Sequence, residues 1–292
     1  MSDGLASLRH RIDGAQDLQS VVRTMKAVAA ASIGKYERAA QAVDVFQHTV
    51  ELSLGVALRA APAAAAVATQ PAGGPVGAVI FGSDQGLVGQ YNEQITALAL
   101  KTLEGLGDAP RIWVVGARAA DHLVGGASGR GPEAVFSVPK AVEAVGPLVE
   151  RLLVASQADG GVSALHLFYN QRGAGAVYTP THTRLLPLDA TWHRRLVERR
   201  WPSHALPEVL GALADTLPAL IGALLYIGLF GACAHALAAE SASRLSAMQR
   251  AEENINELLA TTRRSYFRLR QGAIDEELFD VVLGSEALKP GQ

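Results

Sequence analysis

The feature that most constrains this chain is a seven-residue repeat of apolar side chains at each of its two ends. Seven-residue spacing is typical of helices that pair in a coiled coil. In the N-terminal stretch one row of the repeat is Leu8, Ala15, Val22, Ala29, Tyr36, Val43 and Val50, and its companion row holds Leu18, Met25, Ala39 and Phe46. Because no proline occurs before Pro62, a helix from about Leu5 to Arg59 would extend roughly 80 Å.

The C-terminal stretch repeats the pattern. One row is Leu217, Leu224, Ala238, Leu245, Leu259, Tyr266 and Ala273, and the other is Leu220, Ile227, Ala234, Met248, Ile255 and Leu269. No proline lies between Pro218 and Pro290, so this helix would run for about seventy residues, or roughly 105 Å. A single helix cannot bury its own apolar stripe, so the two helices are predicted to cover each other.

These patterns predict an antiparallel coiled coil of residues 1–60 with residues 207–288, interrupted by an inserted domain. The alternative is two ordinary helices of an α-helical bundle, which periodicity alone allows. The length of both stretches disfavours that alternative, because no compact domain needs helices this long. The many Ala, Ser and Gly positions in the seam predict close packing of the two helices.

The middle of the chain follows a different pattern, in which short apolar runs alternate with helical stretches. Residues 61–75, rich in Ala, Pro and Gly, are predicted to be a linker. Strands are predicted at Val76–Phe81, Arg111–Val115, Ser163–Tyr169 and Val177–Leu186, and helices at Tyr91–Leu106, up to Leu123, and Ala141–Ala155. This alternation predicts a Rossmann-like α/β domain with a partly parallel sheet over residues 76–190, and residues Trp192–Pro207 connect it to the last helix.

Composition excludes several classes of protein. The formal net charge is -2, which argues against a nucleic-acid-binding protein. Cys233 is the only cysteine, so neither an internal disulfide nor a cysteine-rich zinc site can form. Aromatic residues make up 5% of the chain, which disfavours an all-β core. The N-terminus lacks the apolar core of a secretory signal.

The sequence offers no complete site for a reaction. Gly82, Gly86 and Gly89 follow a strand, but their spacing fits neither a phosphate loop nor a dinucleotide fingerprint, so they predict a structural turn. No two of the eight histidines have the spacing of a helical metal motif. Ser83 lacks the elbow motif that presents a hydrolase nucleophile. We therefore predict no catalytic residues, no cofactor and no metal.

Residues 216–239 contain no Asp, Glu, Lys or Arg, and a run of this length could span a bilayer. Against a membrane span, the run contains Pro218, three glycines and His235, and it continues the heptad rows. Two alternatives therefore stay open at this point. One is a coiled-coil scaffold or membrane-associated helical protein, and the other is a small-ligand-binding module that uses the α/β domain.

Three separated motifs resemble those of one family, the γ subunits of F-type ATP synthases. Residues 8–12 and 23–30 are similar to the opening helix of that family. Residues 83–92, Ser-Asp-Gln-Gly-Leu-Val-Gly-Gln-Tyr-Asn, resemble its Asp-Arg-Gly-Leu-Cys-Gly-x-x-Asn turn. Residues 240–248, with Asn254, and residues 270–274 resemble its Glu-x-x-x-Arg-Met-x-Ala-Met and Arg-Gln-x-x-Ile motifs.

The chain departs from the family patterns at several positions. Gln85 stands where the family has Arg, Val88 where it has Cys, and Ala27 where it has a second Met. Residues 249–250 are Gln-Arg in place of Lys-Ala, and residues 216–239 are more apolar than the family norm. These departures favour a divergent branch, such as the alternative, sodium-translocating N-type rotary ATPases, although proton coupling fits equally well.

The resemblance implies a non-catalytic rotor shaft, present once per complex, that transmits torque between the ion-driven c-ring and the catalytic hexamer. The implied partners are the α and β subunits, the ε subunit and the c-ring. The implied location is the cytoplasmic face of the bacterial inner membrane, as a peripheral protein. Carried over from the motifs, Arg270 and Gln271 would contact β-subunit loops, and Met25, Glu240 and Arg244 would lie at the neck of the hexamer cavity.

Each of these five residues also has a purely structural interpretation. Met25 belongs to the companion heptad row and would pack in the seam. Glu240 and Arg244 are four residues apart on one helix, where an ion pair stabilises the helix by about 0.3–0.5 kcal/mol. The sequence alone leaves both interpretations open for these positions.

Overall fold

The computed structural model describes residues 2–60, 74–106, 110–125, 131–173, 177–205 and 207–287. The predicted linker falls mostly on residues 61–73, which lie outside the described residues. The chain divides into two compact units. Unit 1 is Met1–Val28 with Leu245–Gln292, and unit 2 is Ala29–Arg244. Helices α1 (Ser2–Ala60) and α7 (Leu213–Ala287) each contribute one stretch to both units.

The two helices run antiparallel within unit 1. Both Arg23 Nε (3.0 Å) and Lys26 Nζ (2.7 Å) contact the carboxylate of Glu252. Gln19 donates to Asn256, so rising numbers on α1 meet falling numbers on α7. Ala15 and Leu259 are buried in this helix pair. The predicted antiparallel pairing is confirmed here.

The same antiparallel pairing is present in unit 2. There, a buried cluster joins one end of α1 to the beginning of α7. It contains Val50, Leu54 and Leu58 of α1 and Leu217, Leu224 and Ile227 of α7. His235 Nε2 lies 3.0 Å from Asp44 Oδ1 across the pair. The first N-terminal heptad row is buried or half-buried throughout, whereas Leu18 and Phe46 of the companion row are more than half exposed.

Unit 2 contains a five-stranded sheet in the order β3-β2-β1-β4-β5. Strands β1 (Val76–Phe81), β2 (Arg111–Val115), β3 (Ala134–Phe136) and β4 (Ala164–Gln171) are parallel, and β5 (Thr179–Leu186) is antiparallel to β4. The partly parallel sheet is therefore confirmed, and the bounds of β1 and β2 are those predicted.

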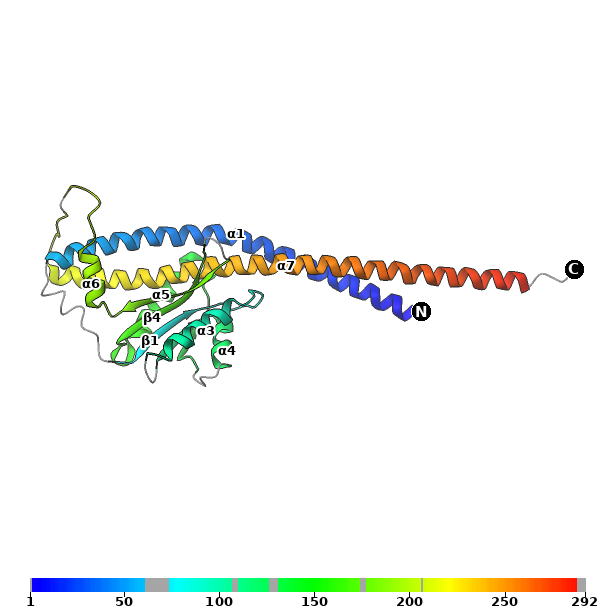
Figure 1. The fold of residues 1–292 in the computed structure, drawn as a ribbon, viewed down its shortest axis with the longest axis horizontal. Helices are drawn as coiled ribbons and strands as arrows, with labels where there is room; N and C mark the ends of the chain where they lie inside the picture. Colours follow the sequence, from blue (N-terminus) through cyan, green and yellow to red (C-terminus); the bar gives the residue numbers. More distant parts are fainter. Residues whose placement is uncertain are drawn as a thin grey trace. The chain divides into compact units, whose positions relative to one another are not determined.

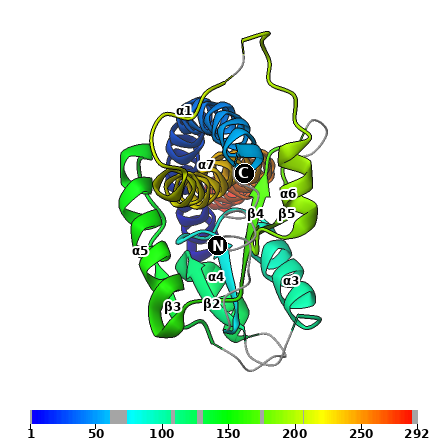
Figure 2. The ribbon, with the colours of Figure 1, turned by 90° about the vertical axis from the view of Figure 1, so that its left-hand side faces the viewer.

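Helices cover both faces of this sheet (Figures 1 and 2). On one face α3 (Tyr91–Leu103) and α4 (Ala117–Val124) pack on a cluster that includes Ile80, Val114 and Phe168. On the other face α5 (Val145–Gln157), preceded by the 3₁₀ turn η1 (Val142–Ala144) and followed by η2 (Ala158–Gly160), packs with α7 against Val79, Trp113 and Leu167. Residues alternate between these two faces along β1 and β4, which is the period expected of strands.

Strand β3 and helix α6 were not predicted from the sequence. Strand β3 has only three residues, too few for a period-2 pattern to register. Helix α6 (Ala190–Val197) lies within residues that the sequence suggested were mainly a connection. Its short, strongly charged sequence hides the one side chain, Leu196, that is fully buried against α1.

Candidate partner-binding surfaces

The C-terminal stretch of α7, in unit 1, exposes an unusually large apolar surface. Its large apolar side chains are between 42% and 70% exposed. They are Phe267, Leu269, Ile274, Leu278, Phe279, Val281, Val282 and Leu283. A helix with apolar residues over so much of its circumference is expected to be surrounded by protein. The heptad rows did not predict this surface, although the width of the apolar stripe after residue 273 indicates it.

The register of the helix pair explains why this surface is open within unit 1. The contacts of Gln19 with Asn256 and of Arg23 with Glu252 place the first residues of α1 opposite the region of Gln271. Helix α7 continues to Ala287 and so extends past the start of α1 by roughly fourteen residues, or about 20 Å. Most of the exposed apolar residues lie in this unpaired part of α7.

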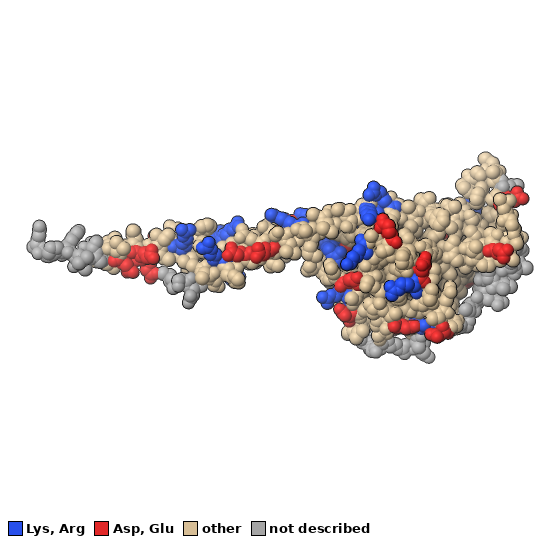
Figure 3. Space-filling model, turned by 180° about the vertical axis from the view of Figure 1, so that it is seen from behind, with Lys and Arg blue, Asp and Glu red and all other residues tan. Residues whose placement is uncertain are grey.

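Charged side chains form two blocks along the same stretch. Basic residues occur between 263 and 270, and acidic residues between 275 and 280. Figure 3 shows the acidic block next to the grey C-terminal end and the basic block further along the helix. The surface therefore offers an apolar face with separate positive and negative sections, which fits a partner of complementary charge.

Arg270 and Gln271 lie at the border between these blocks, and both side chains are exposed. Neither makes a hydrogen bond or an ion pair with the described part of the chain. The guanidinium carries five N–H donors and the amide two, so both side chains are free to donate to an outside acceptor. Their position matches the predicted partner contact, which remains a prediction.

Met25, in unit 1, is half-buried on α1, next to Lys26 and its bond to Glu252. This placement fits its position in the companion heptad row. The half-exposed side chain leaves room for an additional contact with another protein.

Glu240 and Arg244 lie in unit 2, at the end of a stretch of α7, residues 231–243, that is almost completely buried. Arg244 Nη2 donates to Glu240 Oε1 at 2.7 Å, and the side chains of the two residues are 18% and 9% exposed respectively. Burial raises the pKa of Glu240, and the charge of Arg244 opposes that rise. Arg244 Nε is buried and has no partner within the described part of the chain. The ion pair therefore stabilises this part of α7, and 18% of the Arg244 side chain remains accessible to a neighbouring chain.

Next to this pair, the turn between β1 and α3 binds α7 directly. The Tyr91 hydroxyl donates to the Ala236 carbonyl at 2.8 Å, and Ser243 Oγ donates to the Val88 carbonyl at 2.6 Å. Tyr91 is fully buried, which raises the pKa of its hydroxyl well above its ordinary value. These contacts fasten the last part of α7 in unit 2 to the sheet.

Three polar side chains of the turn, those of Ser83, Asp84 and Asn92, are used within the domain. Asn92 accepts from the Ser83 backbone and donates to Ser83 Oγ, each at 2.9 Å. Asp84 accepts from the backbone N–H groups of Ala117 (3.0 Å) and Val138 (2.9 Å). These three side chains are thus already bonded inside the domain and are not available to a phosphate or sugar. The structural interpretation of the glycines is therefore favoured over a small-ligand site.

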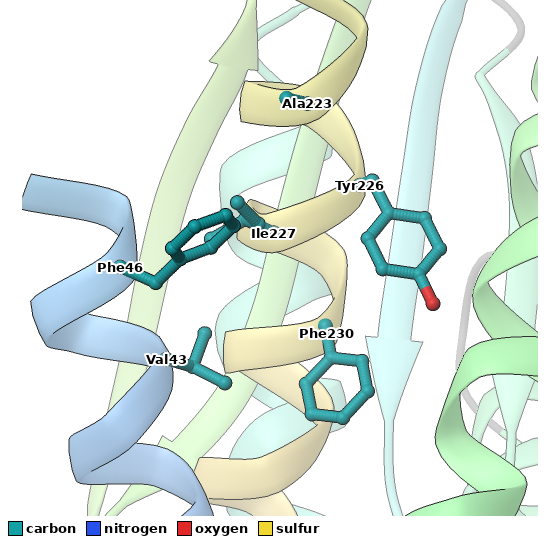
Figure 4. Close-up of a pocket in the computed structure, with 6 residues that line it drawn as sticks. All are labelled: Val43, Phe46, Ala223, Tyr226, Ile227 and Phe230. Atoms are coloured by element: carbon teal, nitrogen blue, oxygen red, sulfur yellow. The ribbon is translucent and has the colours of Figure 1, made fainter. Parts of the chain in front are cut away.

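The uncharged segment of α7 has two different sides in unit 2. On one side, the core against the sheet contains Leu229, Ala232, Cys233, Ala236, Leu237 and Ala238. On the other side, Ala223, Tyr226, Ile227 and Phe230 line an apolar groove with Val43 and Phe46 of α1 (Figure 4). The groove has a volume of about 280 Å³. By length and composition alone α7 could cross a membrane, but 44% of its most apolar window is buried inside the protein.

Two histidines face each other on strands β4 and β5. His166 Nδ1 lies 2.7 Å from His182 Nε2, and the ring centroids are 5.0 Å apart at an angle of 10°. Burial lowers the pKa of His166 to about 4, with smaller contributions from His182 and Arg184. Within the described residues, no group of three or more His, Cys, Asp or Glu side chains is arranged to hold a metal ion.

Comparison with known proteins identifies one family over almost the whole chain. A family model described as ATP synthase matches residues 4–288. The ATP synthase gamma chain of Parafrankia sp. (strain EAN1pec) is 27% identical, with 100% of both chains aligned. The ATP synthase gamma chain of Granulibacter bethesdensis is 28% identical, with 97% of this chain and 99% of the relative aligned.

Solved structures share the fold at lower sequence identity. A chain in the Euglena gracilis mitochondrial ATP synthase, in a structure of OSCP, F1 and the c-ring, has a TM-score of 0.66 and 15% identity, covering 100% of this chain and 98% of that one. A chain in the central stalk and c-ring structure of the Tetrahymena thermophila enzyme has a TM-score of 0.54 and 17% identity, covering 79% and 99%. With its fold, its motifs and its full-length relatives in agreement, this chain belongs to the ATP synthase family, among the gamma chains.

Proposed function

We propose that this chain is the central rotor shaft of a rotary ATP synthase and has no catalytic site of its own. In this proposal it transmits torque between the membrane c-ring and a catalytic hexamer of α and β subunits, and it also binds an ε subunit. One copy serves each complex, at the cytoplasmic face of a bacterial inner membrane. The observation that carries the proposal is the exposed apolar end of α7 together with the donors of Arg270 and Gln271, which have no partner among the residues that the structure describes.

The apolar end of α7 suits a shaft that turns inside a protein sleeve. Apolar side chains make no directional bonds, so their contacts with a surrounding ring change little in energy as the helix rotates. Arg270 and Gln271 can instead make directional, charge-assisted bonds that favour particular rotational positions. A shaft with both kinds of surface can turn freely and still bias which β subunit is open.

The other three predicted contacts belong to the same proposal. Met25 would present its half-exposed thioether to the sleeve, and Arg244 would use the guanidinium donors that Glu240 leaves unoccupied. Glu240 itself would act by holding Arg244 in position, because its carboxylate is buried. These assignments are supported by exposure and hydrogen bonding in the free chain.

The test is the double variant Arg270→Ala with Gln271→Ala in the assembled complex. ATP-driven ion pumping per ATP hydrolysed is expected to fall severalfold, because each lost charge-assisted bond contributes about 1.5–3 kcal/mol. The isolated variant should melt at the wild-type temperature, since neither side chain has a partner within the described chain.

A matched control is Arg118→Ala with Gln94→Ala, which removes the same two side-chain types from exposed positions in unit 2. This control should pump normally. Unchanged pumping by the Arg270 and Gln271 variant would contradict the assigned contacts. Failure of the chain to co-purify with a hexameric ATPase would contradict the rotor proposal as a whole.

A further inference from the structure

The apolar groove between helices α1 and α7 in unit 2 has walls that are held in place. Figure 4 shows the six side chains that line it, Val43 and Phe46 of α1 and Ala223, Tyr226, Ile227 and Phe230 of α7. The two helices are in close contact beside the groove, because a Cβ added at Gly231 would lie 3.2 Å from Val43 Cγ1. The Tyr226 hydroxyl lies against α5, where a Cβ added at Gly146 would be 2.9 Å away. The groove is therefore preformed.

Phe46 is the most exposed side chain of the groove. It is 56% exposed, whereas the other five lining side chains are buried or half-buried. Ala42 and Thr49, one turn before and one turn after Phe46 on α1, are exposed and small, so a partner surface can come close to the aromatic ring. A large exposed aromatic side chain beside an apolar recess is typical of the centre of a protein–protein contact.

A protein fits this groove better than a lipid surface does. Asp44 and His48 are exposed on the same turns of α1 as Phe46, and Asp44 Oδ1 lies 3.0 Å from His235 Nε2. If Phe46 entered the hydrocarbon of a bilayer, the carboxylate of Asp44 would be drawn toward it, which costs several kcal/mol. A protein can cover the groove and leave Asp44 in water. A protein partner therefore accounts for the apolar outer side of the uncharged segment of α7.

The shape of the groove distinguishes between the proposed partners of the shaft. A hexamer that surrounds the shaft slides over it during each turn, and the exposed apolar end of α7 in unit 1 suits such contacts. A side chain inserted into a groove with fixed walls cannot slide without leaving it, so the groove suits a partner that turns with the shaft. A single groove also pairs with a partner present in one copy, whereas the c-ring offers many identical subunits. The ε subunit meets both conditions.

We propose that this groove is a docking site for the ε subunit, which inserts a large apolar side chain beside Phe46 and so turns with the shaft. The inference rests on the proposed function, because that function supplies the ε subunit as a partner. The inserted segment is uncharged, since no charged side chain lines the groove to pair with it. Polar side chains of the partner lie around it, where Asp44 and His48 remain in water.

The first experiment measures the affinity of the full chain for the purified ε subunit by titration calorimetry. Phe46→Glu is expected to lower the affinity at least about tenfold, because a carboxylate would be buried in the groove without a partner. The matched control is Val45→Glu, which changes the adjacent residue of α1. Val45 is 69% exposed and does not line the groove, so this variant should bind like the wild type. Circular dichroism checks that both variants are folded.

A second variant blocks the groove without adding a charge. Ala223→Trp fills the space between the two helices and should weaken binding at least about tenfold, whereas Ala223→Ser should bind nearly as well as the wild type. Ala223→Cys places a thiol in the groove, and the natural Cys233 is fully buried. Alkylation of this new thiol should slow severalfold when the ε subunit is added, and alkylation of Val45→Cys should not.

Each contrary result overturns the proposal. Wild-type affinity in both Phe46→Glu and Ala223→Trp, equal loss in Val45→Glu, or no binding of the ε subunit to the wild-type chain would show that the groove is not its docking site. Dimers of the chain that dissociate in Phe46→Glu would make a second copy the occupant, and flotation with phosphatidylcholine vesicles that Phe46→Glu abolishes would make it lipid. The rotor proposal is tested separately, because co-purification with the hexamer does not depend on this groove.

Discussion

The two stretches of α7, one in each unit, differ in how much of their surface is buried. In unit 2, residues 231–243 are buried except for one half-buried position, and they are fixed by hydrogen bonds from Tyr91 and Ser243. In unit 1, most residues of α7 are exposed and one narrow seam faces α1. Burial of the first stretch supplies stability to the chain itself. Exposure of the second leaves its surface for other chains, so stability and partner binding are assigned to different parts of one helix.

The sharpest test of the packed region is Gly116→Ala in unit 2. Gly116 has φ of 112°, and an added Cβ would lie 2.6 Å from Ser83 N. Backbone strain and overpacking together are expected to cost about 3 kcal/mol of unfolding free energy. Gly86→Ala is the matched control, because nothing lies within 4 Å of its added Cβ. Urea denaturation of both variants measures the difference, and an equal midpoint would show that the β1–α3 turn can shift at little cost.

A second test uses the pH dependence of the same unit. The pKa of His166 is about 4 in the folded chain, below the ordinary value of 6.5. The unfolded chain therefore binds the proton first, and stability should fall as the pH drops from about 6.5 toward about 4. His166→Leu should flatten that part of the curve of unfolding free energy against pH, whereas His122→Gln, at an exposed position of α4, should leave it unchanged. If the unfolding free energy of His166→Leu has the same slope against pH as the wild type, the acid sensitivity comes from another group.

A smaller effect is expected from Tyr91→Phe, which removes the hydroxyl that binds Ala236. Loss of one buried hydrogen bond should lower the unfolding free energy by about 1 kcal/mol. Tyr266→Phe in unit 1 is the comparison, because its hydroxyl has no hydrogen-bond partner in the described chain and its loss should change stability very little. If the two variants unfold alike, the contrast between the fastened and the exposed stretch of α7 fails.

The smallest effect is expected from Glu252→Gln in the helix pair of unit 1. Hydrogen bonds from Lys26 and then Arg23 lower the pKa of Glu252, so its contribution is present above the ordinary carboxyl pKa and is lost as the pH falls below it. Because the pair lies at the surface, the melting temperature should fall slightly at low salt and match the wild type in 1 M salt. A large drop in melting temperature that does not depend on salt would show that these ion pairs stabilise the chain more than their exposure at the surface indicates.

The sequence predicted the elements whose residues carry a clear period. The unbroken heptad row from Leu8 to Val50 is buried or half-buried throughout, and the apolar runs of β1 and β2 begin and end where expected. It could not predict that Leu18 and Phe46 would be exposed, because periodicity defines an apolar stripe but not how much of that stripe the partner helix covers. Helix α6 was missed because one buried leucine among charged residues gives no periodic signal.

For the five candidate partner-contact residues as well, the sequence indicated the positions and the structure supplied their surroundings. The motifs indicated Arg270, Gln271, Met25, Glu240 and Arg244 through resemblance. The structure adds that Arg270 and Gln271 have no side-chain partner among the described residues, that Met25 is half-buried, and that Glu240 is buried in a pair with the half-buried Arg244. A glutamate in a sequence is usually read as a surface residue. Glu240 is buried because Arg244 neutralises it and the turn before Tyr91 packs alongside, and neither condition is local in sequence.

What the sequence by itself determined is the pair of long helices and the alternation of strands and helices between them, because hydrophobic period is a local property of the chain. What only the tertiary structure decided is which side of each helix is covered. The register of α1 against α7 leaves the end of α7 unpaired, and the packing of α6 on α1 turns its arginines outward. Burial and charge at those places depend on contacts between residues far apart in the chain, which no local pattern records.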